Sequence, residues 1–453
     1  MAETFYVENF GCRATQADGA AIERQLMQRG LAPSGRRDRA NVVVLNTCTV
    51  TADADKDARA AIRRVHRENT KTKILVTGCY AQRAPQEIAD LPGVTWVVGN
   101  SHKSQISDVI APSLRDFVSI ESLQAAFNHP IAQSPIHSIF VSDIFAHTEL
   151  LAAPVFETGT HSEKTRPNLK VQDGCNNRCS FCVIPYTRGL SRSLATDEAV
   201  REMNELVAAG YKEVVISGIN LGRWGRDFSK HDRFEKLVRA ILDRSELEKL
   251  RISSVEPMDW SEELIELVAS SPRIAKHAHV PLQSGSDTIL RRMHRKYRPW
   301  HYEDCIHKIR AAMPDAAIGA DVMVGFPGET KELFEESRAF IASLPFTYLH
   351  VFTYSARPGT TAAEMQEQIP VQVARERNQI LRDLAAEKNL AFRKSFVGKT
   401  ISAITLHRSD KYQTEALTDN FLKLHLEGKH EANRWMQCHV GNINHEGMSA
   451  KAV

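Results

Sequence analysis

The chain has 453 residues, of which 42% are hydrophobic and 25% charged, and its formal net charge is +3. This length exceeds what one ordinary hydrophobic core supports, so several domains are expected. The composition excludes a disordered or fibrous chain, while a charge this small says nothing about nucleic acid. The sequence lacks a long apolar run and a signal-peptide pattern, which predicts a cytoplasmic protein with no membrane partner.

Residues 1–110 form the first predicted domain, in which apolar strand patterns alternate with helical patterns. Strands are predicted at Thr4–Val7, Asn41–Leu45 and Lys73–Val76, with helices between them at Gly19–Arg29 and Asp53–Glu68. This alternation favours a doubly wound parallel sheet, an α/β architecture with helices on both faces. Residues 111–166 show weaker periodicity and several prolines, which predicts a linker region with some helix.

Residues 167–370 form the second predicted domain, where the alternation resumes. Its strands are predicted at Leu169–Gln172, Glu213–Ser217, Leu250–Ser253, His277–Pro281, Ile318–Val324 and Tyr348–Tyr354. Six βα units are too few for a closed eight-fold barrel, so we expect an open, partial (βα)6 barrel. A functional site is expected at the carboxyl ends of its strands.

The carboxyl-terminal part of the chain changes character twice. Residues 371–397 read as a helical connector, and residues 398–453 as short β-rich runs. Turns are predicted at Thr418–Asn420 and Glu427–Lys429. This pattern predicts a small antiparallel β-barrel.

Three of the eight cysteines lie in one short segment, CNNRCSFC, directly after the first predicted strand of the second domain. In a reducing cytoplasm such cysteines are more often metal ligands than disulfide partners. Thiolates select iron–sulfur clusters or zinc, and three ligands leave a fourth position open. The segment predicts an iron–sulfur cluster on Cys175, Cys179 and Cys182, with a structural zinc as the alternative.

Three more cysteines, Cys12, Cys48 and Cys79, each follow a different predicted strand of the first domain. The ends of parallel strands share one crevice, so these thiols could converge on a second cluster. The alternative is that they are buried thiols packed as small apolar residues. We expect that simpler role for Cys305 and Cys438.

Glycine-containing loops and basic segments complete the candidate sites. Loops at Ser217–Gly222, Pro281–Gly285 and Gly325–Glu329 should line the barrel mouth and let a cofactor approach the backbone. One predicted nucleic-acid patch combines cations with aromatic rings, and comprises Arg291, Arg292, Arg295, Lys296, Tyr297, Arg298 and Trp300. A second basic group, which could equally be a solvated helix face, comprises Arg59, Arg63, Arg64 and Arg67.

With these residues in view, the chain resembles the methylthiotransferases of the radical S-adenosylmethionine superfamily over nearly its full length. The segment Asn46–Thr51 around Cys48, and Val171–Gly174 before Cys175, are similar to the branch that acts on N6-threonylcarbamoyladenosine in tRNA. The stretch Leu114–His147 is longer than the usual connection between the first two domains and matches no motif of the family.

The resemblance implies two [4Fe-4S] clusters, one on each cysteine triad, and a carboxyl-terminal TRAM barrel. It also places S-adenosylmethionine near a set of residues that comprises Phe181, Gly218, Asn220, Gln283 and Ser284. The implied reaction adds a methylthio group to carbon 2 of N6-threonylcarbamoyladenosine at position 37, next to the anticodon. During that reaction the cluster on Cys175, Cys179 and Cys182 would pass one electron to S-adenosylmethionine, which would release methionine and a 5′-deoxyadenosyl radical.

The implied partners are the anticodon arm of tRNA, a sulfur donor and a reductant such as flavodoxin or ferredoxin. Two sibling activities remain open, namely methylthiolation of N6-isopentenyladenosine in tRNA and of an aspartate in a ribosomal protein. A non-catalytic, metal-stabilised RNA-binding protein is the alternative from another functional class.

Overall fold

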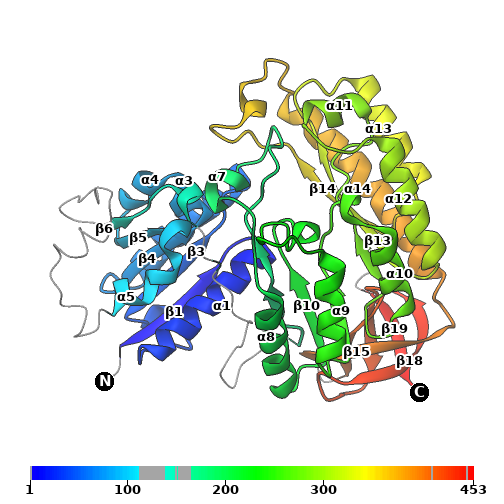
Figure 1. Cartoon of the computed structure of the whole chain (residues 1–453), viewed down its shortest axis with the longest axis horizontal. Coiled ribbons are helices and arrows are strands. Elements are labelled where there is room, and N and C mark those ends of the chain that lie inside the picture. Colours follow the sequence, from blue (N-terminus) through cyan, green and yellow to red (C-terminus); the bar gives the residue numbers. More distant parts are fainter. Residues whose placement is uncertain (1–2, 112–137, 148–149, 151–164, 410–411, 445–446) are drawn as a thin grey trace.

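A computed structural model of the chain describes residues 3–111, 138–147, 150, 165–409, 412–444 and 447–453. In Figure 1 the blue and cyan first domain lies beside the green part of the central domain, and the red carboxyl-terminal barrel lies below. Among the described residues, no helix is both long and apolar enough to cross a membrane.

The first domain is built on a six-stranded sheet in which every pairing is parallel. In sheet order the strands are β2 (Ala32–Pro33), β1 (Thr4–Asn9), β3 (Val42–Thr47), β4 (Lys73–Gly78), β5 (Val94–Gly99) and β6 (Ser138–Phe140). Sequence patterns predicted three of these strands and missed β2, β5 and β6. Strand β6 lies in the stretch predicted as a linker, and most of that stretch, including much of Leu114–His147, lies outside the described residues.

Helices cover both faces of this sheet, which confirms the doubly wound prediction. On one face Ile22 and Leu26 of α1 (Arg13–Gln28) pack with apolar residues of α5 (Ile106–Ile110) against β3. The other face is covered by α2 (Ala52–Glu68), α3 (Cys79–Arg83) and α4 (Pro85–Ala89). Short 3-10 turns occur at η1 (Arg37–Arg39), η2 (Asn100–Gln105) and η3 (Ile144–Ala146).

The central domain contains two three-stranded parallel sheets, and a parallel bridge between Leu250 and Ile274 joins them. The strands are β7 (Asn168–Lys170), β10 (Glu213–Ser217), β11 (Lys249–Ile252), β12 (His277–His279), β13 (Ala317–Val324) and β14 (Tyr348–Thr353). Helices α8 (Thr196–Ala208), α9 (Phe234–Arg244), α10 (Glu262–Ser270), α12 (Pro299–Ala312) and α13 (Lys331–Ser343) alternate with them. This arrangement confirms the open, partial (βα)6 barrel.

Shorter elements surround the mouth of this barrel. The strand pattern predicted to reach Gln172 breaks after Lys170, because the next residues pair antiparallel with a separate strand. These elements are β8 (Gln172–Asp173), β9 (Arg192–Ser193), α7 (Ile184–Arg188), η4 (Leu221–Arg223), η5 (Pro257–Asp259), α11 (Asp287–Arg292) and η6 (Thr361–Glu364).

Helix α14 (Val371–Lys394) packs against β14 and leads to a closed five-stranded barrel. Around the barrel the strands are β15 (Thr400–Ser409), β16 (Gln413–Thr418), β17 (Lys423–Glu427), β19 (Met448–Ala452) and β18 (Trp435–Ile443). The small barrel was predicted, but its pairing of β17 with β19 is parallel. An odd number of strands cannot alternate direction all the way around a closed ring, so one parallel pair is unavoidable.

The carboxyl-terminal barrel packs onto the amino-end side of the central strands. The guanidinium of Arg251, on β11, donates to the carbonyls of Thr418 (3.1 Å) and Asp419 (2.9 Å). The ring of Phe421 lies 5.0 Å from that of His277 and 5.8 Å from that of Tyr348. The predicted turn after β16 therefore closes this end of the central domain.

Candidate cluster and cofactor site

The first cysteine triad lies at the carboxyl ends of three parallel strands, as the sequence predicted. Cys12 follows β1 and precedes α1, Cys48 follows β3, and Cys79 begins α3 after β4. Helices α1 and α2 leave these strand ends toward opposite faces, which is where doubly wound sheets open a crevice. Gly11 has a φ of +101°, and a Cβ there would lie 2.6 Å from the Cβ of Cys48. Glycine is therefore required for the close approach of these two loops.

Cys48 is the thiol of this triad whose ionisation is affected by its neighbours. Burial, followed by the proximity of Cys79 and Cys12, raises the pKa of Cys48 to about 12. The amide nitrogen of Asn100 lies 3.6 Å from the sulfur of Cys79. Neighbouring thiols resist losing their protons together, because the resulting negative charges repel one another. A bound metal centre supplies positive charge and stabilises them as thiolates. The donor set fits an iron–sulfur cluster with one position left open.

The second triad lies on the loop between β8 and α7, at the mouth of the central barrel. The sulfur of Cys175 accepts hydrogen bonds from the backbone N–H of Asn177 (3.4 Å) and from the amide of Asn220 (3.6 Å). Burial raises the pKa of Cys182 to about 12, and the adjacent Cys179 adds to the effect. This loop likewise offers three thiols to a cluster.

Arg295 contacts this second triad, which corrects the prediction made for the basic segment. Its guanidinium donates to the sulfur of Cys179 (3.3 Å) and pairs with Glu256. Arg295 and Tyr297 are both buried, and the Tyr297 hydroxyl donates to the carbonyl of Leu282 (2.6 Å). Proximity to Tyr297 and Glu256 outweighs burial and keeps the pKa of Arg295 well above its ordinary value.

The proposed stacking patch is therefore wrong for Arg295 and Tyr297. The chain turns back into the barrel after α11, where His294 has a φ of 56°. Lys296 and Trp300 remain exposed on this segment. In the second basic group, Arg59 donates to the Tyr80 hydroxyl (2.8 Å), while the other three arginines are exposed on α2.

The five residues expected near S-adenosylmethionine have different surroundings. Asn220 reaches Cys175, as described above, and its side-chain oxygen is buried without a hydrogen-bond partner among the described residues. Phe181 lies edge-to-face with Phe326 at 6.4 Å. Beside the second triad, Asn220 thus offers a hydrogen-bond acceptor, and Phe181 and Phe326 offer an aromatic surface.

Of the other three residues, Gly218 and Gln283 matter for their backbone geometry, and Ser284 is buried. A Cβ at Gly218 would lie 2.9 Å from the side chain of Gln172, so only glycine fits there. Gln283 adopts a φ of 67° and donates its N–H to the carbonyl of Asp321 (2.8 Å). The Ser284 hydroxyl is fully buried, which leaves its side chain no exposed surface in this structure.

A buried charge network joins the first and central domains between the two triads. Asp18 of α1 accepts from Lys103 (2.8 Å), from Arg188 (2.9 Å) and from Lys170. Asp173, two residues before Cys175, accepts from Lys170 (2.9 Å) and Arg188 (2.9 Å). Burial alone would raise the pKa of Asp18, but the three cations hold it well below its ordinary value. Sequence reasoning missed this network, because nothing in the pattern links residues so far apart.

A second interdomain contact lies behind Cys48. Arg357 of the central domain donates to the hydroxyl of Thr49 (2.8 Å) and pairs with Asp55 of α2. Arg83 of α3 donates to the same hydroxyl (2.9 Å) and the same carboxylate (3.0 Å). The loop that carries Cys48 is thereby held against the central domain.

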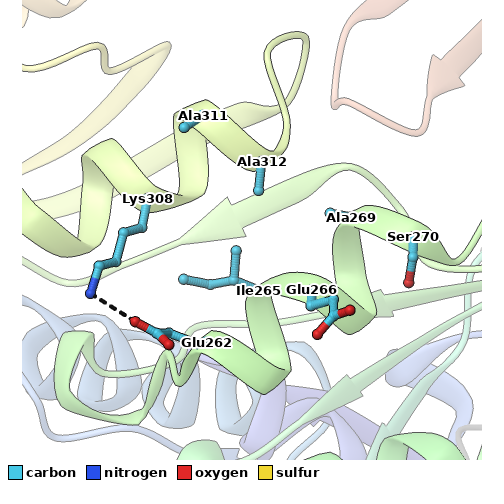
Figure 2. Close-up of a pocket in the computed structure, with 8 residues that line it drawn as sticks. All are labelled: Glu262, Ile265, Glu266, Ala269, Ser270, Lys308, Ala311 and Ala312. Carbon is cyan, nitrogen blue, oxygen red and sulfur yellow. Dashed lines mark hydrogen bonds and ion pairs between the residues drawn. The ribbon is translucent and has the colours of Figure 1, made fainter.

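Other features lie apart from this site. Cys305 and Cys438 lie in hydrophobic cores, as predicted, and all eight cysteines are free thiols. A shallow surface hollow between α10 and α12 is lined by alanines and by Ile265, with an ion pair between Lys308 and Glu262 (3.1 Å) at one end (Figure 2). It contains no thiol or imidazole and does not adjoin either triad.

Comparison with known proteins agrees with this geometry. Residues 169–341 match the Radical SAM superfamily, and residues 4–99 match the Uncharacterized protein family UPF0004. The Threonylcarbamoyladenosine tRNA methylthiotransferase MtaB of Aquifex aeolicus is 35% identical over 427 residues, which are 94% of this chain and 97% of the relative. The chain belongs to the radical SAM methylthiotransferase family. The family prediction is confirmed.

Further relatives of this methylthiotransferase extend the comparison. MtaB of Bacillus subtilis is 36% identical over 94% of this chain and 90% of its own. A tRNA-2-methylthio-N(6)-dimethylallyladenosine synthase of Saccharopolyspora erythraea is 32% identical over 92% of this chain and 81% of its own. The solved structure of the radical S-adenosylmethionine methyltransferase TsrM from Kitasatospora setae has a TM-score of 0.60 at 16% identity. It covers 80% of this chain and 77% of its own, and supports the fold.

Family membership brings S-adenosylmethionine and [4Fe-4S] clusters as the cofactors of this methylthiotransferase. The donor sets fit them, since each triad offers three thiols and the amide oxygen of Asn220 is an unpaired buried acceptor beside the second triad. The predicted class of enzyme and its cofactors are confirmed.

Proposed function

We propose that this methylthiotransferase acts on N6-threonylcarbamoyladenosine in tRNA, next to the anticodon, and adds a methylthio group at carbon 2. The observation that carries the proposal is the presence of two three-cysteine sets at strand ends of adjacent domains, joined by the Asp18 network. Relatives named for this activity match almost the whole chain, which supports the choice of substrate.

We assign Cys12, Cys48 and Cys79 to one [4Fe-4S] cluster and a second set of ligands to the other, namely Cys175, Cys179 and Cys182. When bound, the second cluster supplies the electron that cleaves S-adenosylmethionine, and the first provides a site for the sulfur that is transferred. Two clusters with open positions distinguish this chemistry from a structural zinc, which would need a fourth protein ligand.

The residues around the triads orient these groups. The amide of Asn220 and the guanidinium of Arg295 donate hydrogen bonds to cysteine sulfurs and hold two of the three thiolates in place. Phe181 and Phe326 form an apolar wall that limits access of water to the loop. The network around Asp18 fixes the first triad relative to the second, so that one base can be reached from both.

The partners follow from the same assignment. We propose that the anticodon arm of tRNA binds at the barrel mouth, where exposed Tyr186 and Trp300 can stack on unpaired bases and Lys296 can contact phosphate. A sulfur donor must replenish the first cluster, and a reductant such as flavodoxin or ferredoxin must supply electrons to the second.

Mass spectrometry of tRNA nucleosides from a deletion strain tests the proposal. We expect the loss of 2-methylthio-N6-threonylcarbamoyladenosine with accumulation of its unmodified precursor, and recovery of the product when the gene is restored. Loss of 2-methylthio-N6-isopentenyladenosine instead would assign the sibling tRNA activity. Loss of methylthiolation on a ribosomal-protein aspartate would assign the other sibling.

A further inference from the structure

The inner face of the central sheet is polar and carries both cations and carboxylates. On each barrel strand, alternate side chains such as Val214 and Ile216 pack in the core with the outer helices. Successive side chains of a strand point to opposite faces, so the others face the interior of the open barrel. The polar residues in this inner set include Asn168, Lys170, Glu213, Arg251, His277, His279, Asp321, Tyr348 and His350.

Glu213 supplies negative charge to the part of this face nearest the first domain. Its carboxylate accepts from Arg251 (2.6 Å) and lies 3.4 Å from Arg166. Glu213 and Arg251 are almost completely buried. One carboxylate is therefore already shared by two guanidiniums.

Arg13, the first residue of α1, brings a further guanidinium to the junction of the first and central domains. Its carbonyl accepts from the amide of Asn168 (2.9 Å), where α1 packs beside β7. The Arg13 side chain is exposed to solvent and forms no ion pair among the described residues. A guanidinium is charged at neutral pH, so Arg13 carries a full positive charge here.

Other groups on the inner face do not neutralise this charge. Asp321 lies 3.1 Å from His279 and 3.3 Å from His350, and these two partners outweigh burial in lowering its pKa. Burial, with a further contribution from Arg251, lowers the pKa of His277 well below its ordinary value, so this imidazole is neutral. The region around Arg13 thus presents a cation that a bound anion would complement.

We propose that Arg13 binds the carboxylate of the threonyl group and thereby selects N6-threonylcarbamoyladenosine over adenosines with an uncharged N6 substituent. This inference rests on the proposed function. The planar guanidinium matches a carboxylate in shape and in its paired hydrogen bonds. Arg13 directly follows Cys12, so the same contact would hold the base beside the first triad.

Two synthetic anticodon stem-loop RNAs test the proposal. One carries N6-threonylcarbamoyladenosine, and the other carries its threoninamide analogue, which has nearly the same shape without the charge. With the reconstituted wild-type enzyme, kcat/KM for the amide RNA should be about 10- to 100-fold lower, as expected for a lost hydrogen bond to a charged group. The Arg13→Gln variant should modify both RNAs at the amide rate, and Arg13→Lys should retain part of the preference.

Arg382→Gln is the matched control, because Arg382 is exposed on α14 and has no ion pair among the described residues. It should keep the wild-type ratio between the two RNAs. Equal kcat/KM for both RNAs with the wild type, or an undiminished ratio with Arg13→Gln, would overturn the inference. If Arg13→Gln binds less iron than the wild type, its kcat/KM values no longer report on Arg13 alone. In that case the anaerobic binding affinities of the variant for the two RNAs are compared, and they must show the same loss of preference. A wild-type enzyme that cleaves S-adenosylmethionine but modifies neither RNA would instead overturn the proposed function.

Discussion

Replacing Asp18 by asparagine should weaken the junction between the first and central domains. Asp18 is almost completely buried and accepts from three cations, Lys103, Lys170 and Arg188. In Asp18→Asn the carboxylate of Asp173 would still pair with Lys170 and Arg188. Lys103 pairs with Asp18 and, among the described residues, forms no ion pair with Asp173, so its ammonium would lose its carboxylate partner. Breaking a buried pair by removing one partner costs about 3–5 kcal/mol. We expect a loss near 3 kcal/mol, because the asparagine oxygen still accepts one hydrogen bond.

The loss of unfolding free energy in Asp18→Asn should become smaller as pH rises. Burial already lowers the pKa of Lys103, and Asp18 opposes that effect. In Asp18→Asn the folded protein therefore binds fewer protons at Lys103 than the unfolded chain, so its stability increases as pH rises. The difference in unfolding free energy between Asp18→Asn and the wild type should be largest near pH 7. It should shrink toward about pH 9.5, as the pH approaches the ordinary lysine pKa.

Anaerobic urea unfolding of the reconstituted enzyme, followed by circular dichroism, measures both effects. Asp57→Asn, an exposed change on α2, is the matched control and should alter the unfolding free energy by less than about 0.5 kcal/mol. Adding Lys103→Met to Asp18→Asn should restore at least about 1 kcal/mol, since it removes the orphaned ammonium. An Asp18→Asn protein within about 1 kcal/mol of wild type at pH 7 would refute the reasoning.

Two further predictions concern the clusters. Changing Cys12, Cys48 and Cys79 together to alanine should lower the iron content from about eight to about four per chain while preserving cleavage of S-adenosylmethionine. Undiminished iron would contradict a cluster on these three residues. Arg295→Gln removes a charged hydrogen bond to Cys179 and should shift the midpoint potential of that cluster by roughly 60–120 mV to more negative values. Redox titration followed by electron paramagnetic resonance measures this shift, and the exposed neighbour Lys296→Gln should leave the potential unchanged.

Local sequence patterns determined much of the architecture and the chemistry of the site. The spacing of Cys175, Cys179 and Cys182 places three thiols on one loop whatever the rest of the chain does. Apolar strand patterns were sufficient for the barrel strands, because a buried strand requires apolar residues along its own length. The strand-end positions of Cys12 and Cys48 followed from the same patterns, since parallel strands end at one edge of a sheet.

Only the tertiary structure decided which charged groups meet. Arg295 looked like part of an exposed basic patch, but the turn after α11 buries it against Cys179. Asp18 meets Arg188 across 170 positions of sequence, and Arg13 lies at the junction with the central domain only because α1 packs beside β7. Periodicity shows which face of an element is apolar and contains no information about the partner of a polar side chain. That choice depends on how complete elements pack, so it becomes visible only in the folded chain.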